Sequence, residues 1–237
     1  MAEFKWGKQR LPFEVHGRDI VLCDNVTDAL TAAKALAAAF DTRVISGSDD
    51  VRGTLRDGFG KADQSTIARV MQLLQLDDDA LEWRLKDASP LRRLLAAAAA
   101  AAVKGDAVLL FELASFTAMP FDLAHVFRHL HALHTGLGLQ IVAIIVDPAL
   151  ISSAGTHLSV LTGRGVVESA EVAAALADPQ SEELLQRLLA TPVPNPLAMQ
   201  QRRVQRAATT VVNYSHTQIV QLPTADSIAL AGGDVTG

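Results

Sequence analysis

The sequence predicts an α/β protein whose mostly parallel β-sheet is covered by helices. Short apolar segments alternate with helical patterns along most of the chain, as they do in proteins built from strand–helix–strand units. The segments at 107–111 and 140–146 are almost entirely apolar, which is typical of strands buried on both faces of a parallel sheet. A chain of 237 residues can form one such domain with small appendages.

The first half of the chain contains two predicted strands and several predicted helices. Residues 19–23 form a short apolar run, and an alanine-rich helical pattern follows, with Thr27 as a candidate N-cap. A second short strand is predicted at 43–46. Ser89 and Pro90 supply a cap and a first-turn proline for a long helix. The helices of this half are predicted at 27–40, at 65–74 with Asp63 or Ser65 as the cap, at 77–85 and at 91–104.

The second half continues the alternation. Its strands are predicted at 107–111, 140–146, 157–161 and 165–168, and its helices at 122–135, after Pro148, at 169–177 and at 181–190. Gly136 or Gly138 closes the first of these helices. We therefore expect the α/β domain at 1–190, a C-terminal extension at 191–222 that begins with a proline-rich linker, and a disordered tail at 223–237.

The bulk composition restricts the class of protein. Apolar residues make up 49% of the chain, yet no run reaches the roughly 18 residues that a membrane-spanning helix needs. The N-terminal residues have no apolar core of a secretory signal. A net charge of −5 argues against nucleic-acid binding, and the single cysteine, Cys23, fits a reducing compartment. We expect a cytoplasmic protein without membrane insertion.

Four segments between residues 51 and 170 occur in a recognisable order. They are Val51-Arg-Gly-Thr-Leu-Arg-Asp-Gly-Phe-Gly, then Asp87-Ala-Ser-Pro-Leu-Arg-Arg before the alanine-rich helix, then Val108-Leu-Leu-Phe-Glu, and finally Leu158-Ser-Val-Leu-Thr-Gly-Arg-Gly-Val-Val-Glu. This order resembles that of the ATP-binding subunits of ABC transporters: the entry to a helical subdomain, the signature loop, the Walker B strand and the closing strands. The resemblance covers about half of the chain. It implies a P-loop NTPase-like fold with a helical insert at about 51–88 and a reduced β-subdomain.

The nucleotide-binding motifs of that family are altered here. A P-loop uses glycine amides, a lysine and a Ser/Thr hydroxyl to hold phosphates and Mg²⁺. After the first strand this chain instead has Asp24, Asn25 and Thr27, with no glycine or lysine, and its carboxylates would repel a triphosphate. The segment Gly58-Phe-Gly-Lys61 is not expected to be a phosphate loop, because Leu55 stands where its first glycine should be.

The other motifs of the family, which are the signature, Walker B and switch motifs, are altered as well. Pro90 and Leu91 follow Ser89 in place of the signature glycines, Phe111 stands at the Mg²⁺-binding aspartate of Walker B, and Asp147 or its neighbour replaces the switch histidine. These three changes leave one carboxylate, Glu112, as a relic of the catalytic base or as a capping acid. Because phosphoryl transfer depends on positioned charge, we expect no ATPase activity, no nucleotide cofactor and no metal.

The resemblance also implies protein partners. ABC ATPases act as face-to-face dimers, so this chain would pair with itself or with an active ATPase subunit. The insert at 55–85 is where the family usually contacts a membrane permease. The expected role is structural or regulatory, in a transport or export complex at the inner face of the membrane.

Alternative interpretations remain open from the sequence. A small-ligand-binding protein or enzyme on a Rossmann-like sheet would use Asp24, Glu112 and Asp147 at the strand ends. His125 and His129 are four residues apart and could chelate a metal, although the apolar stripe of their helix predicts that both lie on a solvated face. Cys23 is expected to be a small core residue rather than a nucleophile.

Overall fold

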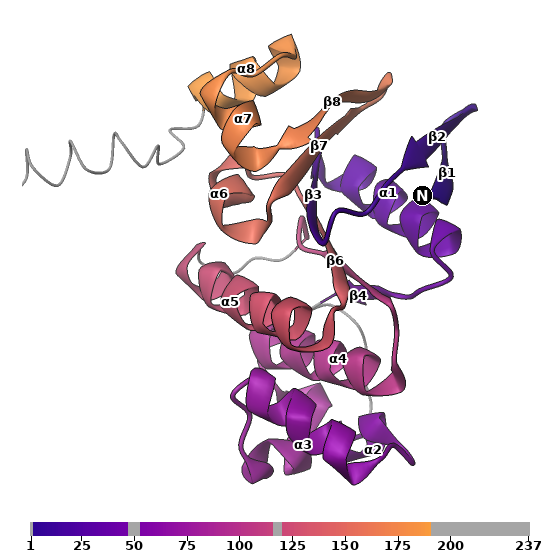
Figure 1. Ribbon diagram of the computed structural model, residues 1–237, viewed down its shortest axis with the longest axis vertical. Helices are drawn as coiled ribbons and strands as arrows, with labels where there is room; N and C mark the ends of the chain where they lie inside the picture. The colour runs from indigo at the N-terminus through magenta and orange to yellow at the C-terminus, as the bar shows by residue number, and fades with distance from the viewer. Residues whose placement is uncertain (1, 47–52, 116–119, 191–237) are drawn as a thin grey trace, which may run out of the picture. The chain divides into compact units, whose positions relative to one another are not determined.

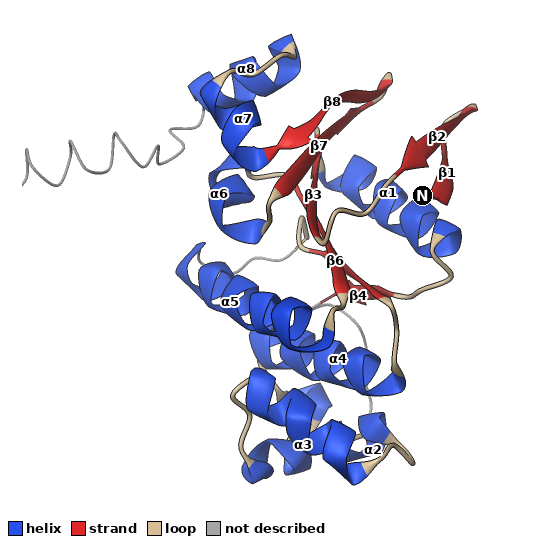
Figure 2. Ribbon diagram, viewed as in Figure 1, coloured by secondary structure: helices blue, strands red, loops and turns tan. Residues whose placement is uncertain are grey.

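A six-stranded β-sheet organises the structure. The computed structural model describes residues 2–46, 53–115 and 120–190, so the predicted extension and tail lie outside the described residues. The strand order is β4-β5-β6-β3-β7-β8, and every neighbouring pair is parallel except β7 and β8, which are antiparallel (Figures 1 and 2). The strands are β3 (Arg18–Cys23), β4 (Val44–Ser46), β5 (Val108–Glu112), β6 (Gln140–Ile145), β7 (His157–Thr162) and β8 (Gly165–Glu171). The predicted mostly parallel sheet is confirmed.

Each face of the sheet is covered by its own apolar core. Ile20 and Phe111 point to one face, where α4 (Pro90–Lys104), α5 (Pro120–Leu137) and α6 (Ile151–Ala154) pack. Val21 and Leu110 point to the other face, which α1 (Val26–Ala39) covers. This alternation follows from the two-residue period of a strand, and burial of both faces explains why the central strands carry almost no polar residues.

An antiparallel hairpin, β1 (Ala2–Trp6) and β2 (Gln9–Phe13), lies on the same side as α1. Phe4 and Phe13 meet edge to face with ring centroids 6.2 Å apart. The Trp6 indole N–H donates to the Thr162 carbonyl at 2.7 Å, which fixes the hairpin to the end of β7. The sequence analysis expects a reduced β-subdomain but does not predict these two strands.

The insert consists of short helical elements that pack against α4 and α5. They are α2 (Leu55–Phe59), α3 (Gln64–Leu73), η1 (Asp78–Glu82) and η2 (Leu85–Asp87). Thr54 and Asp57 form a capping box on α2, so Gly58 belongs to a helix and not to a phosphate loop. The single acidic helix predicted at 77–85 is wrong in detail, because the segment forms two separate 3₁₀ turns.

The C-terminal part of the described chain departs from the prediction at one boundary. The helix expected from residue 169 begins at Val172, because β8 stays paired with β7 as far as Glu171. Two helices follow, α7 (Val172–Ala177) and α8 (Glu182–Ala190). Among the described residues, no helix is both long enough and apolar enough to cross a bilayer.

Candidate functional site

The connection between β3 and α1 is two residues long, Asp24 and Asn25. The Asn25 side chain accepts a hydrogen bond from the Asp28 amide at 2.9 Å and donates one to the Asp28 carboxylate at 2.9 Å. Asn25 is therefore the N-cap of α1, and the assignment of this role to Thr27 is corrected: the backbone only turns helical at Val26, so a cap must precede it. A P-loop motif spans about eight residues, and this connection has no room for one.

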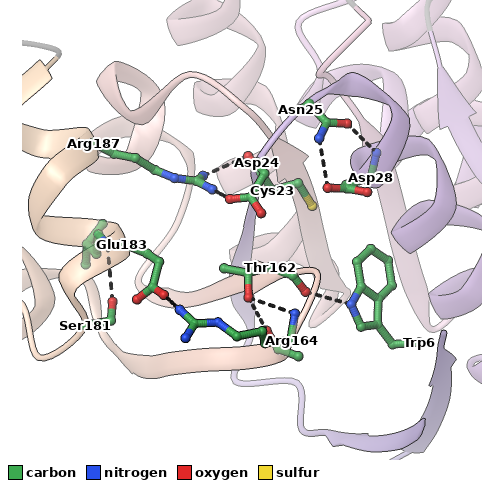
Figure 3. Close-up of polar contacts among 12 residues, drawn as sticks. Trp6, Cys23, Asp24, Asn25, Asp28, Thr162, Arg164, Ser181, Glu183 and Arg187 are labelled. Atoms are coloured by element: carbon green, nitrogen blue, oxygen red, sulfur yellow. Dashed lines mark hydrogen bonds and ion pairs between the residues drawn. The ribbon is translucent and has the colours of Figure 1, made fainter. Parts of the chain in front are cut away.

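An arginine from α8 reaches this corner. Arg187 donates to the Cys23 carbonyl at 2.8 Å and forms an ion pair with the Asp24 carboxylate (Figure 3). Its side chain is only 17% exposed. The guanidinium therefore lies at the carboxyl end of β3, which is where open parallel sheets usually bind their ligands. Asp24, predicted to repel phosphate, is instead neutralised from within the chain.

Two further contacts hold α8 in place. The buried Glu168 carboxylate of β8 accepts hydrogen bonds from the Ser181 amide at 2.9 Å, the Ser181 hydroxyl at 2.6 Å and the Gln180 amide at 3.2 Å. An anion at a helix N-terminus is also favoured by the helix dipole. At the β7–β8 turn, Arg164 pairs with Glu183 (Figure 3). Arg187 thus belongs to a helix that is anchored to the middle of β8 through Glu168 and to the β7–β8 turn through Arg164.

Cys23 is fully buried beside this corner. Burial, together with the nearby Asp28 and Glu112 carboxylates, raises the pKa of its thiol to about 12, and Arg187 lowers it only in part. A thiol with this pKa stays protonated at neutral pH and is a poor nucleophile. The prediction that Cys23 is a core residue is confirmed.

Glu112 ends β5 and is buried, with 1% of its surface exposed. Its carboxylate accepts hydrogen bonds from the Ser115 amide at 2.8 Å and from the Ser115 hydroxyl. The sequence left two interpretations of Glu112 open: a relic of the catalytic base or a capping acid. The contacts with Ser115 fit a carboxylate that caps the turn after β5. The preceding residue, Phe111, is completely buried in the core against α4 and α5.

The remaining predicted residues lie at helix starts. Ser89 caps α4 by accepting from the Arg92 amide at 3.3 Å, and Pro90 occupies the first turn. The Arg92 guanidinium lies 4.8 Å from the centre of the Trp83 ring, so it packs against the insert. Asp147 caps η3 (Pro148–Leu150) by accepting from the Ala149 amide at 2.9 Å. Ser89 and Asp147 therefore act as caps of the helices that follow them.

The prediction of a solvated histidine face on α5 is wrong. His129 is 3% exposed, and its Nε2 atom lies 2.9 Å from Nε2 of His125. The reason is that α3 packs against α5, so this side of the helix is covered. Among the residues that the structure describes, no group of three or more His, Cys, Asp or Glu side chains could hold a metal.

This buried histidine predicts a pH dependence of stability. Burial, followed by the nearby His125 and Arg128, lowers the pKa of His129. The unfolded chain therefore takes up a proton near pH 6.5 while the folded chain does not, so the free energy of unfolding falls as the pH drops below about 6.5. One such histidine contributes at most about 1.4 kcal/mol per pH unit. Urea unfolding of a His129→Gln variant should show a shallower dependence.

The exposed His131 on the same helix supplies the matched control for this prediction. His131→Gln should change the acid slope less than His129→Gln does, because its pKa is lowered by weaker burial. Equal slopes for the wild-type chain and the His129→Gln variant would contradict the prediction, because they would show that His129 binds its proton equally well in the folded and unfolded states.

Several solved structures share this arrangement of strands and helices. CbiO1 of Clostridium perfringens, part of the ABC transporter complex CbiONQ, superposes with a TM-score of 0.60 at 10% identity, over 81% of this chain and 93% of that one. A nucleotide-free ATP-binding cassette of an ABC transporter gives 0.55 at 11% identity, over 78% and 96%. Another cassette, in its ADP conformation, gives 0.56 at 10% identity, over 77% and 95%.

The chain has an ABC-ATPase-like fold. At these identities the comparison concerns the fold alone. No protein-family model matches the chain, and no curated protein matches it by sequence. The ABC-ATPase-like fold brings Cys23, Asp24 and Arg187 together at the end of β3. It does not bring Ser89 or Asp147 into any hydrogen bond or ion pair with them that the described residues record.

Sequence reasoning missed Arg187. The residue lies 164 positions from Cys23 along the chain, on a helix whose pattern predicts only amphipathicity. One signal was available: a basic residue interrupts the leucines of that helix, and Asp24 is an acidic residue at a strand end. Pairing the two requires knowing that the chain after β8 places α8 next to the carboxyl end of β3. The sequence pattern does not specify this.

Proposed function

We propose that the chain is a catalytically inactive ABC-ATPase-like subunit with a structural or regulatory role in a transport or export complex associated with a membrane. The observation that carries the proposal is the corner between β3 and α1. Its connection of two residues is too short for a phosphate loop, and the Arg187 guanidinium is held there by Asp24 and the Cys23 carbonyl.

The residues at the Walker B position, Phe111 and Glu112, support the same proposal. The aspartate that would hold Mg²⁺ is replaced by Phe111 in the apolar core, and Glu112 is engaged by Ser115. Phosphoryl transfer needs cations and amides placed around the phosphates, and the side chains at these positions instead satisfy one another. The role left to such a subunit is to present surfaces to partners: a second copy or an active ATPase subunit, and a membrane permease that contacts the insert of α2 and α3. Such a subunit would act in the cytoplasm at the inner face of the membrane.

Nucleotide titration tests the proposal. We expect no saturable binding of a fluorescent ATP analogue with Mg²⁺ up to millimolar concentration, and phosphate release no faster than in buffer. An active ATP-binding cassette measured in parallel verifies the assay. Saturable binding with turnover that Glu112→Gln abolishes would overturn the proposal, because it would assign Glu112 a catalytic role.

The variant Arg187→Ala separates the effect of the Arg187 guanidinium from that of the short connection between β3 and α1. It removes the guanidinium but keeps the connection of Asp24 and Asn25, so nucleotide should still not bind. Binding gained by Arg187→Ala would mean that α8 alone blocks a competent site, and the chain would then be a regulated ATPase. Sedimentation of the purified chain, alone and with a candidate ATPase subunit, tests the pairing.

A further inference from the structure

A cavity of about 550 Å³ lies under the β1–β2 hairpin, beside the β7–β8 ladder. This volume is within the range of small-molecule sites. One wall is apolar and includes Leu11, Phe13 and Val166. The polar lining residues are His16, His157, Ser159 and Ser169. None of these polar residues takes part in the corner around Arg187, so the cavity is a separate feature of the molecule.

The register of β7 and β8 places three of the polar groups in a hydrogen-bonded row. Ser159 lies directly opposite Ser169, and His157 is two residues before Ser159 on the same face. The Ser169 hydroxyl is 3.0 Å from Nε2 of His157, and Ser159 Oγ is 3.2 Å from Ser169 Oγ. Ser169 is exposed, whereas Ser159 is buried. An accessible hydroxyl therefore contacts an imidazole nitrogen at the edge of a cavity.

The surroundings of His157 suit a proton acceptor. Its ring stacks on His16 with centroids 3.9 Å apart, and His16 is in turn held by Asp19, which accepts from its Nδ1 at 3.2 Å and its amide at 2.8 Å. Burial and the neighbouring His16 lower the pKa of His157, so the ring is neutral at pH 7. The carboxylates of Asp19, Glu171 and Glu14 act in the opposite direction and would stabilise the ring once it is charged.

We propose that Ser169 and His157 form an acyl-transfer site, with Ser169 as nucleophile and His157 as its general base. The Ser169 oxygen attacks the carbonyl carbon of an ester while its proton passes to Nε2 of His157. The bond to the alcohol oxygen then breaks, and that oxygen takes the proton from His157. Water, deprotonated by the same nitrogen, hydrolyses the acyl group from Ser169, which regains its proton.

The cavity also restricts the substrate. Its apolar wall fits a short aliphatic or aromatic acyl group, and no lysine or arginine is among its lining residues, so a carboxylate or phosphate on the substrate would not be stabilised there. The carboxylate of Glu14 at the edge further disfavours anions. The expected substrate class is an uncharged or cationic ester with a small apolar acyl group.

Acylation by p-nitrophenyl butyrate tests the proposal on the full chain. In samples quenched with acid during turnover, we expect at most one acyl group per chain, located on Ser169 by peptide mass spectrometry, together with release of p-nitrophenolate. His157→Gln should slow this acylation by about 100-fold or more, since general-base catalysis contributes about 10²–10⁴-fold. The rate should rise with pH through a midpoint below the usual range of a histidine.

Matched serine variants distinguish this site from unspecific acylation. Ser169→Ala should abolish the labelling, whereas Ser152→Ala, at an exposed serine in α6, should leave it unchanged. Circular dichroism and thermal unfolding verify that each variant is folded. Acylation that is confined to lysines, or that Ser169→Ala and His157→Gln leave unchanged, would overturn the proposal. Neither result bears on nucleotide binding at the β3 corner.

Discussion

Replacing Phe111 by aspartate, the residue that the Walker B motif would have there, is expected to unfold the protein. Phe111 is completely buried in the core between the sheet and its helices. Loss of a buried phenylalanine side chain costs about 3–5 kcal/mol. An unpaired carboxylate in the same place adds a further desolvation cost, so the total loss should exceed about 5 kcal/mol, which is comparable with the whole stability of many domains.

Urea unfolding followed by circular dichroism measures this effect. Phe111→Leu is the control, because it keeps an apolar side chain and should cost much less than Phe111→Asp. A folded Phe111→Asp variant with a near-wild-type midpoint would show that this position is open to solvent and available to a metal. The expected outcome would mean that the core does not tolerate a carboxylate at position 111.

The second large effect is expected at Leu184, the fully buried leucine of α8. Leu184→Ala should lower the free energy of unfolding by about 2–5 kcal/mol, since it removes buried methyl groups and leaves a cavity. The neighbouring Leu185 is 43% exposed, so Leu185→Ala should change stability by less than about 0.5 kcal/mol. The pair differs by one position on one helix and is therefore a matched comparison.

Hydrogen exchange on the same two variants locates the effect. If α8 is anchored as described, Leu184→Ala should also raise exchange at the amides of Gln180 and Ser181, which donate to Glu168. Equal stability of the two variants would show that Leu184 is not buried in the apolar core in solution.

The elements with strong local patterns were predictable from the sequence. The almost entirely apolar strands at β5 and β6 and the capped, alanine-rich α4 follow from periodicity and from Ser89 and Pro90. The lack of glycine and lysine between Cys23 and Val26 can be read directly from the sequence, because a P-loop has fixed residue types at fixed spacing. The Arg187 contact was not visible, because it joins residues that are distant in the sequence.

The errors have the same physical origin. His129 was predicted to be solvated because it lies outside the apolar stripe of α5. A second surface of α5 is covered by α3, and the stripe does not reveal that contact. The helix predicted at 169 begins later because pairing with β7 overrides the helical preference of Ala170. In both cases a neighbouring element decided the outcome, and a single sequence does not specify the neighbour.

The contacts of Trp6 and Arg187 have a consequence for the order of folding. Trp6 bonds to Thr162 across 156 positions of the chain, and Arg187 bonds to Cys23 across 164. Such closures lose much chain entropy before any contact compensates for it, so they form late. During synthesis, the carboxyl end of β3 cannot form its contacts with Arg187 until residue 187 has been synthesised. We therefore expect the last described helix to complete the carboxyl end of β3 late in folding.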